Sequence, residues 1–489
     1  MLSERKPEEI VVLTPRSVVY HVGDMAPVSR RDSLLPRLLP LSRTAIVFGA
    51  VLLVAIAARA LHLWITLDAP GFAWIDSDHY LSGQAASLVR NGHWQWTWDA
   101  VDYVWHGRHW VLSPLYPVFL SLIGAVSNPM AGAIGHIALS VAAVGSLFVA
   151  GRSLHSIRAG LVAAGLAAVW LAEIGGTPHF MQERLFVPLV VASFAWLLHA
   201  TSTEAAPTRF AVAGGLFALT ALTRPTALYY VPISVAIVVF GPGGPPRRVA
   251  IRQGVALLAG WLAVVGPYIA AVSAAKGELV LVDNRGAIEY FQHDAFSPLT
   301  EMLAQLTTTP AEYLREKAAV ARALLHLNGG RWAQLYGTAW TPEGALGWKL
   351  AAHAFIDVPL LLVLALAPFG VALARARREV WLLGAWIAVS VILTVLANYG
   401  GARYRSPIEF PLILLASIPL AHGLPKRVVS IPRLTAAMAM SVSLLALLLA
   451  QVPASLSAKT QSGVTGREAH TPPMDRHRIA SGRNQRVGF

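Results

Sequence analysis

Two aspartates stand two positions apart in Asp76-Ser77-Asp78-His79-Tyr80, a polar stretch that follows the first long apolar run of the chain. Carboxylates at this spacing on a loop can supply a general base, ligands for a divalent metal ion, or hydrogen-bond acceptors for sugar hydroxyls. The structural alternative is that Asp76 or Asp78 caps a helix while Tyr80 anchors the chain at a lipid–water boundary. The pattern leaves both interpretations open, and it signals a metal cofactor at Asp76 and Asp78 only weakly.

A third carboxylate, Glu183, stands in Gln182-Glu183-Arg184 at the start of another apolar run. A glutamate at a helix N-terminus gains roughly 0.3–1 kcal/mol from the helix dipole, so a purely structural role is a strong alternative. A catalytic role is favoured because Glu183 is predicted to lie on the same face of the protein as Asp76 and Asp78. We therefore treat these three carboxylates as the candidate catalytic residues.

Four arginines lie in or beside apolar runs: Arg59 well along the first run, Arg224 in Thr223-Arg224-Pro225, and Arg403 and Arg405 in Arg403-Tyr404-Arg405. An arginine within a membrane span is costly and needs a partner or a wet cavity. A guanidinium forks phosphate oxygens bidentately, so a phosphate at the bilayer surface would explain the four together. Snorkelling of each side chain to lipid headgroups is the alternative.

Other ligand chemistry is weakly represented in the chain. The histidines at positions 62, 136 and 353 are isolated on apolar stretches, and no histidine spacing typical of a zinc site is present. Since the chain has no cysteine, disulfides, thiolate metal sites and cysteine nucleophiles are excluded.

These residues are set in a chain of 489 residues that is 55% hydrophobic and 13% charged, with a mean hydropathy of +0.55. That is too little charge to cover a soluble protein of this length, and many apolar runs approach the ~20 residues that cross a bilayer as a helix. The net charge of +13 falls in short gaps between the runs, which is typical of cytoplasmic loops. We predict an all-α integral membrane protein whose partners include membrane lipids and no nucleic acid.

Apolar stretches predict helices near 44–67, 113–127, 129–150, 157–174, 184–199, 209–222, 226–240, 253–273, 352–373, 380–398, 406–422 and 433–452. As a helix, 113–127 is roughly 22 Å long, short of the ~30 Å hydrocarbon core, and it opens with two prolines. If it does not cross, most basic residues fall on the side of the N-terminal tail; if it crosses, that bias largely reverses. We therefore predict about eleven transmembrane helices, with 113–127 lying along the outer surface or dipping into it.

The predicted organisation is a disordered cytoplasmic tail (1–43), a transmembrane domain (44–452) and a polar, basic C-terminal tail (453–489). Two extracytoplasmic loops interrupt the transmembrane domain: a first loop with surface helices (68–128) and a larger, partly helical loop (274–350). Within the larger loop, Thr309-Pro310-Ala311-Glu312 predicts the start of a helix that continues to Leu327.

Six short motifs together resemble the GT-C glycosyltransferases, in particular the protein O-mannosyltransferase and aminoarabinose-transferase-like group (glycosyltransferase family 39-like). The resemblance runs from about residue 44 to 423. The motifs are Asp76-Ser-x-x-Tyr80-Leu with Ala85, Ala86, Leu88 and Gly92; Ser113-Pro114-Leu115-Tyr116-Pro117; Gly151-Arg152-Ser153-Leu154 with Arg158; Glu183 with Leu185 and Phe186; Ala221-Leu222-Thr223-Arg224-Pro225; and Arg403-Tyr404-Arg405-Ser406-Pro407.

The resemblance implies a GT-C-like bundle and a polyprenyl-phosphate-linked sugar donor, with a lipid, glycan or protein as acceptor. It implies that Asp76 activates the acceptor hydroxyl, Glu183 assists, and arginines hold the phosphate, with inversion at the anomeric carbon. The basic residue that often precedes Pro-Pro-Leu in the family is replaced by Leu112-Ser113, so Arg108 or His109 would substitute for it. The full set of candidate substrate-binding residues is Arg59, Tyr80, Arg108, Arg224, Arg403, Tyr404 and Arg405.

Two other functions fit the same residues. A transporter or flippase of a lipid-linked or anionic solute would use the arginines to bind cargo, although the chain shows no inverted repeat with paired broken helices. A glycan ligase would use the same carrier phosphate. The resemblance favours the transferase, in a bacterial inner or plasma membrane with its active site facing the extracytoplasmic side.

Overall fold

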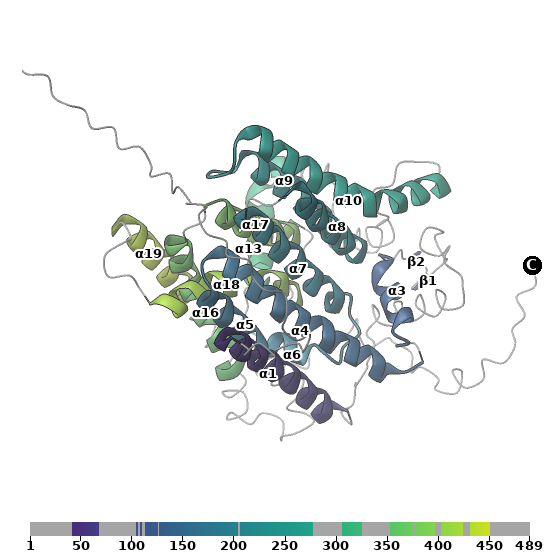
Figure 1. The fold of residues 1–489 in the computed structure, drawn as a ribbon, viewed down its shortest axis with the longest axis horizontal. Helices are drawn as coiled ribbons and strands as arrows, with labels where there is room; N and C mark the ends of the chain where they lie inside the picture. The colour runs from purple at the N-terminus through teal and green to yellow at the C-terminus, as the bar shows by residue number, and fades with distance from the viewer. Residues whose placement is uncertain are drawn as a thin grey trace, which may run out of the picture. The chain divides into compact units, whose positions relative to one another are not determined.

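The computed structural model describes residues 42–67, 104–105, 108–109, 113–125, 127–203, 206–276, 306–324, 353–374, 377–396, 402–423 and 431–449. Every predicted span except 113–127 overlaps one of the helices named below, which differ in length (Figure 1). These helices are α1 (Arg43–Thr66), α4 (Pro129–Leu154), α5 (Ile157–Ala168), α7 (Glu183–Ser202), α8 (Pro207–Thr223), α9 (Tyr230–Phe240), α10 (Arg247–Lys276), α16 (Val358–Leu373), α17 (Arg377–Leu396), α18 (Ser406–His422) and α19 (Ile431–Leu449).

Six helices of the described residues are long and apolar enough to cross a membrane. With this many apolar helices the protein is an integral membrane protein, as predicted. Helices as short as α5, with 12 residues, do not reach across a bilayer alone, so the number of crossings stays a prediction. Besides helices, the described residues form one antiparallel pair of two-residue strands, β1 (Val104–Trp105) and β2 (Arg108–His109).

Within the described part of 113–127, the only helix is α3 (Leu115–Leu122), which has eight residues. At 1.5 Å per residue it is about 12 Å long, far too short to cross a bilayer. The chain leaves it through Gly124, whose φ of 71° suits a residue without a side chain. Asn128 then caps α4 by accepting a hydrogen bond from the backbone N–H of Met130, and Pro129 occupies the first helical position.

The stretch 157–174 was expected to be one helix and is instead two, α5 and the short α6 (Leu171–Gly175). Neither proline nor a left-handed glycine causes the break. The carbonyl oxygens of Ala167 and Ala168, at the end of α5, accept hydrogen bonds from the Arg59 guanidinium at 3.3 and 2.9 Å. A buried cation at a helix C-terminus satisfies these carbonyls and opposes the helix dipole, which stabilises the early end.

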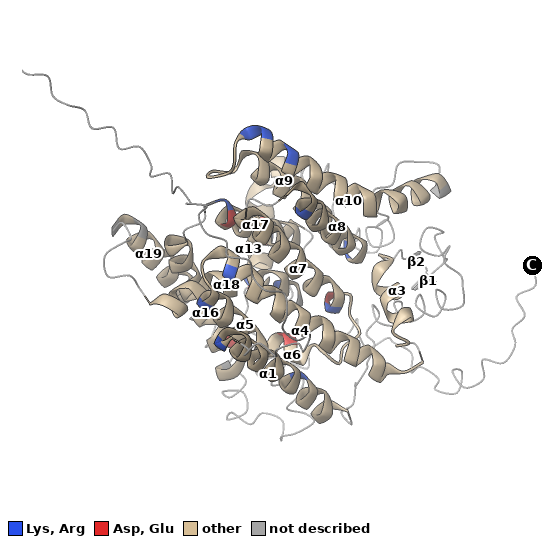
Figure 2. Cartoon of the chain, viewed as in Figure 1, with Lys and Arg blue, Asp and Glu red and all other residues tan. Residues whose placement is uncertain are grey.

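One end of the bundle carries many of the described basic residues (Figure 2). Contacts between helix termini define this end: Arg378 donates to Gln253 at 3.0 Å, and Ser156 hydrogen-bonds His422 at 2.7 Å. Basic residues near these termini are Arg152, Arg158, Arg209, Arg247, Arg248, Arg252 and Arg378. Such a bias is typical of a cytoplasmic face, which we predict this end to be.

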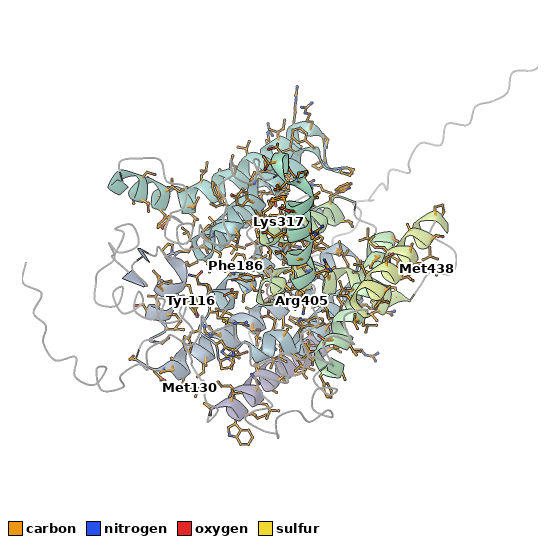
Figure 3. The ribbon with its side chains drawn as sticks, turned by 180° about the vertical axis from the view of Figure 1, so that it is seen from behind. Tyr116, Met130, Phe186, Lys317, Arg405 and Met438 are labelled. Atoms are coloured by element: carbon orange, nitrogen blue, oxygen red, sulfur yellow. The ribbon has the colours of Figure 1, made fainter. Side chains whose placement is uncertain are left out.

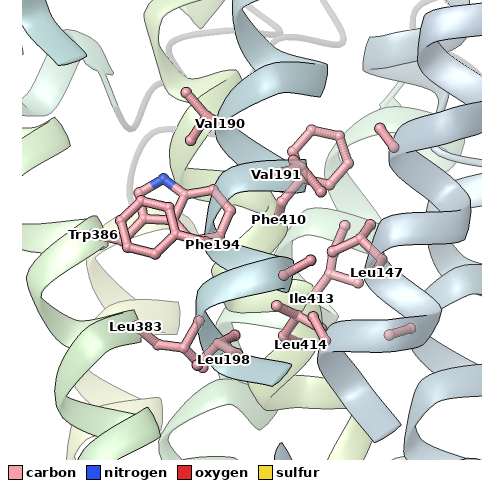
Figure 4. Packing of buried hydrophobic residues seen from close by; sticks show 14 of the residues in the cluster. Leu147, Val190, Val191, Phe194, Leu198, Leu383, Trp386, Phe410, Ile413 and Leu414 are labelled. Carbon is pink, nitrogen blue, oxygen red and sulfur yellow. The ribbon is translucent and has the colours of Figure 1, made fainter. Parts of the chain in front are cut away.

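Close packing holds the helices together where small residues face each other. A methyl group on Gly214 of α8 would overlap the carbonyl oxygen of Leu257 in α10, and one on Gly260 of α10 would overlap that of Ala211 in α8. Larger side chains fill the centre, where Phe194 of α7 stacks on Trp386 of α17 with ring centroids 4.3 Å apart (Figure 4). Because lipid tails are as apolar as these side chains, van der Waals packing rather than removal from water drives this association.

Candidate functional site

Three glutamate–arginine pairs gather at the end of the bundle opposite the basic end, where α7 begins, α8 ends and α18 begins. The pairs are Glu183–Arg224 at 2.9 Å, Glu173–Arg184 at 3.3 Å and Glu409–Arg405 at 2.6 Å. All three carboxylates belong to buried residues. Buried charges of this kind need partners, and each glutamate has one.

Glu183 and Arg224 come together because each lies at the end of a helix. Glu183 is the first residue of α7, while Arg224 follows α8 in an extended conformation, with φ −146° and ψ 128°. Pro225 disfavours the helical conformation at the preceding residue, so α8 ends where Arg224 stands. The guanidinium carbon lies 5.4 Å from the centre of the Tyr404 ring and 5.6 Å from that of Phe186. The structure therefore brings the side chains of Glu183, Arg224 and Tyr404 together.

Arg405 ends the short helix η4 (Ala402–Arg405) and directly precedes α18. Its Nε donates to Glu409 Oε1 at 2.6 Å, and the indole Nε1 of Trp170 donates to Glu409 Oε2 at 2.6 Å. Only 2% of Arg405 and 2% of Glu409 is exposed, so both oxygens of this carboxylate are used within the protein interior. Figure 3 labels Arg405 and Phe186 among the surrounding side chains.

Glu409 and Trp170 were not among the residues predicted from the sequence. The spacing of Arg405 and Glu409, four residues apart on an otherwise apolar helix, is the signal that could have found the glutamate. No comparable signal marks Trp170, which stands 239 positions before Glu409 in the chain.

The Glu173–Arg184 pair holds the connection between α6 and α7. Arg184 donates to Glu173 Oε2 at 3.3 Å, and its guanidinium lies so close to Gly176 that a methyl group there would overlap it. A side chain at position 176 would therefore displace the Arg184 guanidinium. The pair was not predicted, and its place inside the connection gives it a structural role.

The described hydrogen bonds of Arg59, a predicted substrate-binding residue, go to α1, α4 and α5. Only 1% of it is exposed. Besides capping α5, it donates to Ala55 O at 3.0 Å and to Ser140 Oγ at 2.8 Å. The Arg59 guanidinium thus donates to acceptors within the protein. These partners explain a buried arginine at this position without a bound ligand.

A buried histidine ties α3 to the same end of the bundle. His136 Nδ1 lies 3.2 Å from Thr177 O, and its Nε2 lies 3.2 Å from the Tyr116 hydroxyl. Because a carbonyl oxygen only accepts, Nδ1 carries the proton and the Tyr116 hydroxyl donates to Nε2. Phe180 packs edge-on against the imidazole, 5.2 Å between centroids. The Ser-Pro-Leu-Tyr-Pro motif is thus fixed to the connection that leads into Glu183.

The helix α13 (Pro310–Leu324) packs against α17 and η4. It begins at Pro310, where the sequence predicted a helix start. Its less exposed side carries Tyr313, Lys317, Val320, Ala321 and Leu324 at helical spacing. Burial raises the pKa of Tyr313, and the carboxylate of Glu316 raises it further. Lys317 lies 5.1 Å from the centre of the Tyr313 ring, with its side chain 14% exposed (Figure 3).

The remaining predicted site residues lie outside the described residues in whole or in part. Asp76, Asp78 and Tyr80 are not described. Arg108 and Arg403 are described in their backbone alone, in β2 and η4. Within the described ranges no group of three histidine, aspartate or glutamate side chains could hold a metal ion. That search does not reach Asp76 and Asp78, so the weakly signalled metal there stays a prediction.

Comparison with known proteins gave distant structural likenesses. No family model matches the chain, and no curated protein matches it. The archaeal oligosaccharyltransferase AglB from Archaeoglobus fulgidus, bound to an inhibitory peptide and a dolichol-phosphate, is similar with 14% identity and a TM-score of 0.46. The Archaeoglobus fulgidus oligosaccharyltransferase in its apo form is similar with 13% identity and a TM-score of 0.49.

ArnT from Cupriavidus metallidurans bound to undecaprenyl phosphate is similar with 14% identity and a TM-score of 0.46, covering 83% of this chain and 72% of that one. Each match to an Archaeoglobus fulgidus oligosaccharyltransferase structure covers 85% of this chain. This chain spans 56% of the oligosaccharyltransferase chain in both. At these scores the likenesses identify neither the family nor the activity of this protein.

Proposed function

We propose that this protein is a GT-C-type membrane glycosyltransferase that moves a sugar from a polyprenyl-phosphate-linked donor to an acceptor hydroxyl. The observation that carries the proposal is the cluster of Glu183, Arg224, Tyr404 and Arg405 at one end of the bundle. Residues selected from separate motifs of the sequence are neighbours in the structure. The order of the six motifs along the chain supports the same assignment.

In the proposed reaction a carboxylate takes the proton of the acceptor hydroxyl, and the hydroxyl oxygen attacks the anomeric carbon of the donor. The bond from this carbon to the phosphate oxygen breaks, and polyprenyl phosphate leaves with the electron pair. In-line displacement inverts the anomeric centre. Asp76 is the first candidate for the base, with Asp78 and Glu183 as the other carboxylates of the site. Arginines stabilise the charge on the departing phosphate.

The Glu183–Arg224 pair connects the proton to the phosphate. While Glu183 is ionised, it balances the charge of Arg224 at 2.9 Å. When Glu183 receives a proton from the acceptor, directly or from Asp76, Arg224 loses its counter-charge as negative charge develops on the phosphate. A cation uncovered at that moment stabilises the transition state more than the ground state, which is what accelerates a reaction.

The proposed site faces the extracytoplasmic side of a bacterial inner or plasma membrane, because the opposite end carries the basic residues expected of a cytoplasmic face. Acceptors available there are lipids, glycans and proteins. The polyprenyl chain of the donor lies in the bilayer and presents its phosphate at the depth of Arg224 and Arg405.

Turnover of the carrier tests the proposal. Purified protein in nanodiscs is incubated with a polyprenyl-phosphate sugar and a membrane-extract acceptor, and release of bare polyprenyl phosphate is followed by mass spectrometry. The transferase releases carrier in proportion to glycosylated product, and Glu183→Gln slows this release. Movement of intact donor across a sealed vesicle without carrier release would instead identify a transporter.

A further inference from the structure

We propose that the start of α10 and the end of α9 bind the headgroup of an anionic phospholipid in the leaflet at the basic end of the bundle. The site consists of three arginines, Arg247, Arg248 and Arg252, and of an exposed apolar face of α10 that follows them. It is separate from the glutamate–arginine pairs at the other end of the bundle. The inference therefore does not depend on the proposed transfer reaction.

The three arginines are open to a ligand. All of them have exposed side chains, and Figure 2 shows this basic group in blue at the start of α10. Among the described residues, no carboxylate forms an ion pair with any of the three. The sequence has no aspartate or glutamate from 205 to 277, and Glu379, which follows Arg378 on α17, is buried. Their counter-charge must therefore come from outside the described part of the chain.

The positions of these charges are unfavourable for the helix that carries them. α10 begins at Arg247 and has no acidic residue in its first turn, so the arginines stand where the helix dipole is also positive. Arg248 and Arg252 are four residues apart on the helix and repel each other. A bound anion offsets both effects. A phosphate suits these side chains because a guanidinium forks two of its oxygens.

The length of α10 brings the arginines to the level of lipid headgroups. The helix has 30 residues, and at 1.5 Å per residue it is about 45 Å long, against ~30 Å for the hydrocarbon core. Its charged first turns therefore extend beyond the hydrocarbon. Phe240, which ends α9, is 71% exposed, and its ring centre lies 6.0 Å from the guanidinium carbon of Arg247. An exposed aromatic ring beside an arginine is typical of the lipid–water boundary.

An exposed apolar face of α10 continues from the arginines toward the bilayer interior. Val255 and Leu262 follow Arg252 at helical spacing and are 61% and 47% exposed. Ala259, between them on the same face, is exposed as well. The ten residues from Arg252 to Leu262 span about 15 Å, so an acyl chain can lie along this face while its phosphate contacts the arginines. Charge and apolar surface thus follow each other as they do in a phospholipid.

Arg152 and Arg158 supply a matched control, because they are two exposed arginines at the same end of the bundle. The residues that follow Arg158 on its face of α5, Leu161 and Val162, are half-buried, so this pair lacks the exposed apolar face. If the arginines at this end only orient the chain in the membrane, removing either pair should affect lipid binding equally.

The test measures how much lipid the full-length protein retains, by native mass spectrometry, from micelles that contain phosphatidylglycerol or phosphatidylcholine. We expect the wild-type protein to retain phosphatidylglycerol about tenfold more strongly than phosphatidylcholine. The double variant Arg248→Gln with Arg252→Gln should lose most of this preference. The control variant, Arg152→Gln with Arg158→Gln, should change it by less than about twofold.

Two further measurements identify the site and the ligand. A photoactivatable phosphatidylglycerol should crosslink to residues 240–262 of the wild-type protein, and less so in the Arg248→Gln, Arg252→Gln variant. Glycerol 1-phosphate carries the same phosphate without acyl chains. It should compete at least about tenfold less well than short-chain phosphatidylglycerol, because it leaves the apolar face of α10 uncovered.

Four results would overturn the inference. These are equal retention of the two lipids by the wild-type protein, equal losses in the two double variants, crosslinks only outside 240–262, and equal competition by glycerol 1-phosphate. The last result would assign the arginines to a soluble phosphate. If Arg248→Gln with Arg252→Gln does not fold, the crosslinks and the competition on the wild-type protein decide. None of these measurements uses polyprenyl phosphate, so their failure leaves the proposed function untouched.

Discussion

Replacing Arg224 by lysine keeps a positive charge beside Glu183 and removes the planar guanidinium. The structure shows what the guanidinium does besides carrying charge: it donates to Glu183 at 2.9 Å and lies over the rings of Phe186 and Tyr404. Lysine can keep the ion pair but cannot bond to Glu183 and fork a phosphate in one plane. If Arg224 merely reached toward lipid headgroups, lysine would serve equally well.

The expected loss follows from the bond that lysine cannot make. A hydrogen bond to a charged group contributes about 1.5–3 kcal/mol, and a cation over an aromatic ring contributes about 0.5–1 kcal/mol at an exposed site. A loss of about 2 kcal/mol corresponds to roughly thirtyfold weaker binding. We expect this weakening for the donor and for bare polyprenyl phosphate alike, because both present the same phosphate.

The assay is titration of a short-chain polyprenyl-phosphate sugar, and separately of bare polyprenyl phosphate, into the purified protein. Arg209→Lys is the matched control: Arg209 stands on the same helix, α8, but at its opposite end, and is exposed. Affinity within twofold of wild type in Arg224→Lys, with the ion pair to Glu183 intact, would refute the assignment of Arg224 to the phosphate. Weakened binding of the sugar-linked donor alone would instead place Arg224 at the sugar.

Four further predictions concern the candidate base, the topology, the helix packing and Lys317. Asp76→Asn should lower turnover by about 10²-fold with donor affinity unchanged, as for loss of a general base; wild-type turnover would transfer that role to Asp78 or Glu183. Accessibility tags in 152–158, 241–252 and 374–379 should report the cytoplasm, and tags near 320 and 400 the outside; an outside signal from 152–158 would reject the predicted topology. Gly260→Leu should lower the melting temperature because its side chain would meet the α8 backbone, whereas Gly266→Leu, with open space around it, should not. Lys317→Met should weaken polyprenyl-phosphate binding about fivefold, while Arg315→Met, on the exposed side of α13, should leave it unchanged; equal affinities would remove Lys317 from the site.

The helices were predictable because a chain in lipid must satisfy its backbone hydrogen bonds internally, so long apolar runs become helices. That 113–127 holds no membrane-spanning helix was predictable too, because the stretch is short and opens with two prolines. The break between α5 and α6 was not, since Val169 and Trp170 carry no local signal for ending a helix. It depends on Arg59, a residue 108 positions before Ala167, and such long-range caps are invisible to a local pattern.

The candidate site, too, could be predicted from the sequence only in part. Arginines at the ends of apolar runs indicated a charged cluster, because each needed a partner at that depth. The sequence did not say which partner each would take: Arg405 pairs with Glu409, Arg184 with Glu173, and Arg224 with Glu183. Pairing depends on which helix ends meet, and the residues alone do not show that.

The balance of charges determines how a phosphate can bind at this site. In the three glutamate–arginine pairs the opposite charges cancel. A phosphate that binds there would meet arginines whose charge is already matched by carboxylates. Arginine has five N–H donors and can serve a second acceptor, but net attraction requires cations beyond the pairs. Our candidates for these cations are Arg403, in η4, and Lys317, on the adjacent α13, which pairs with the exposed Glu316 at 3.4 Å. Under this arrangement the pairs orient the guanidinium groups, the additional cations attract the donor, and protonation of Glu183 releases the charge of Arg224 when the phosphate departs.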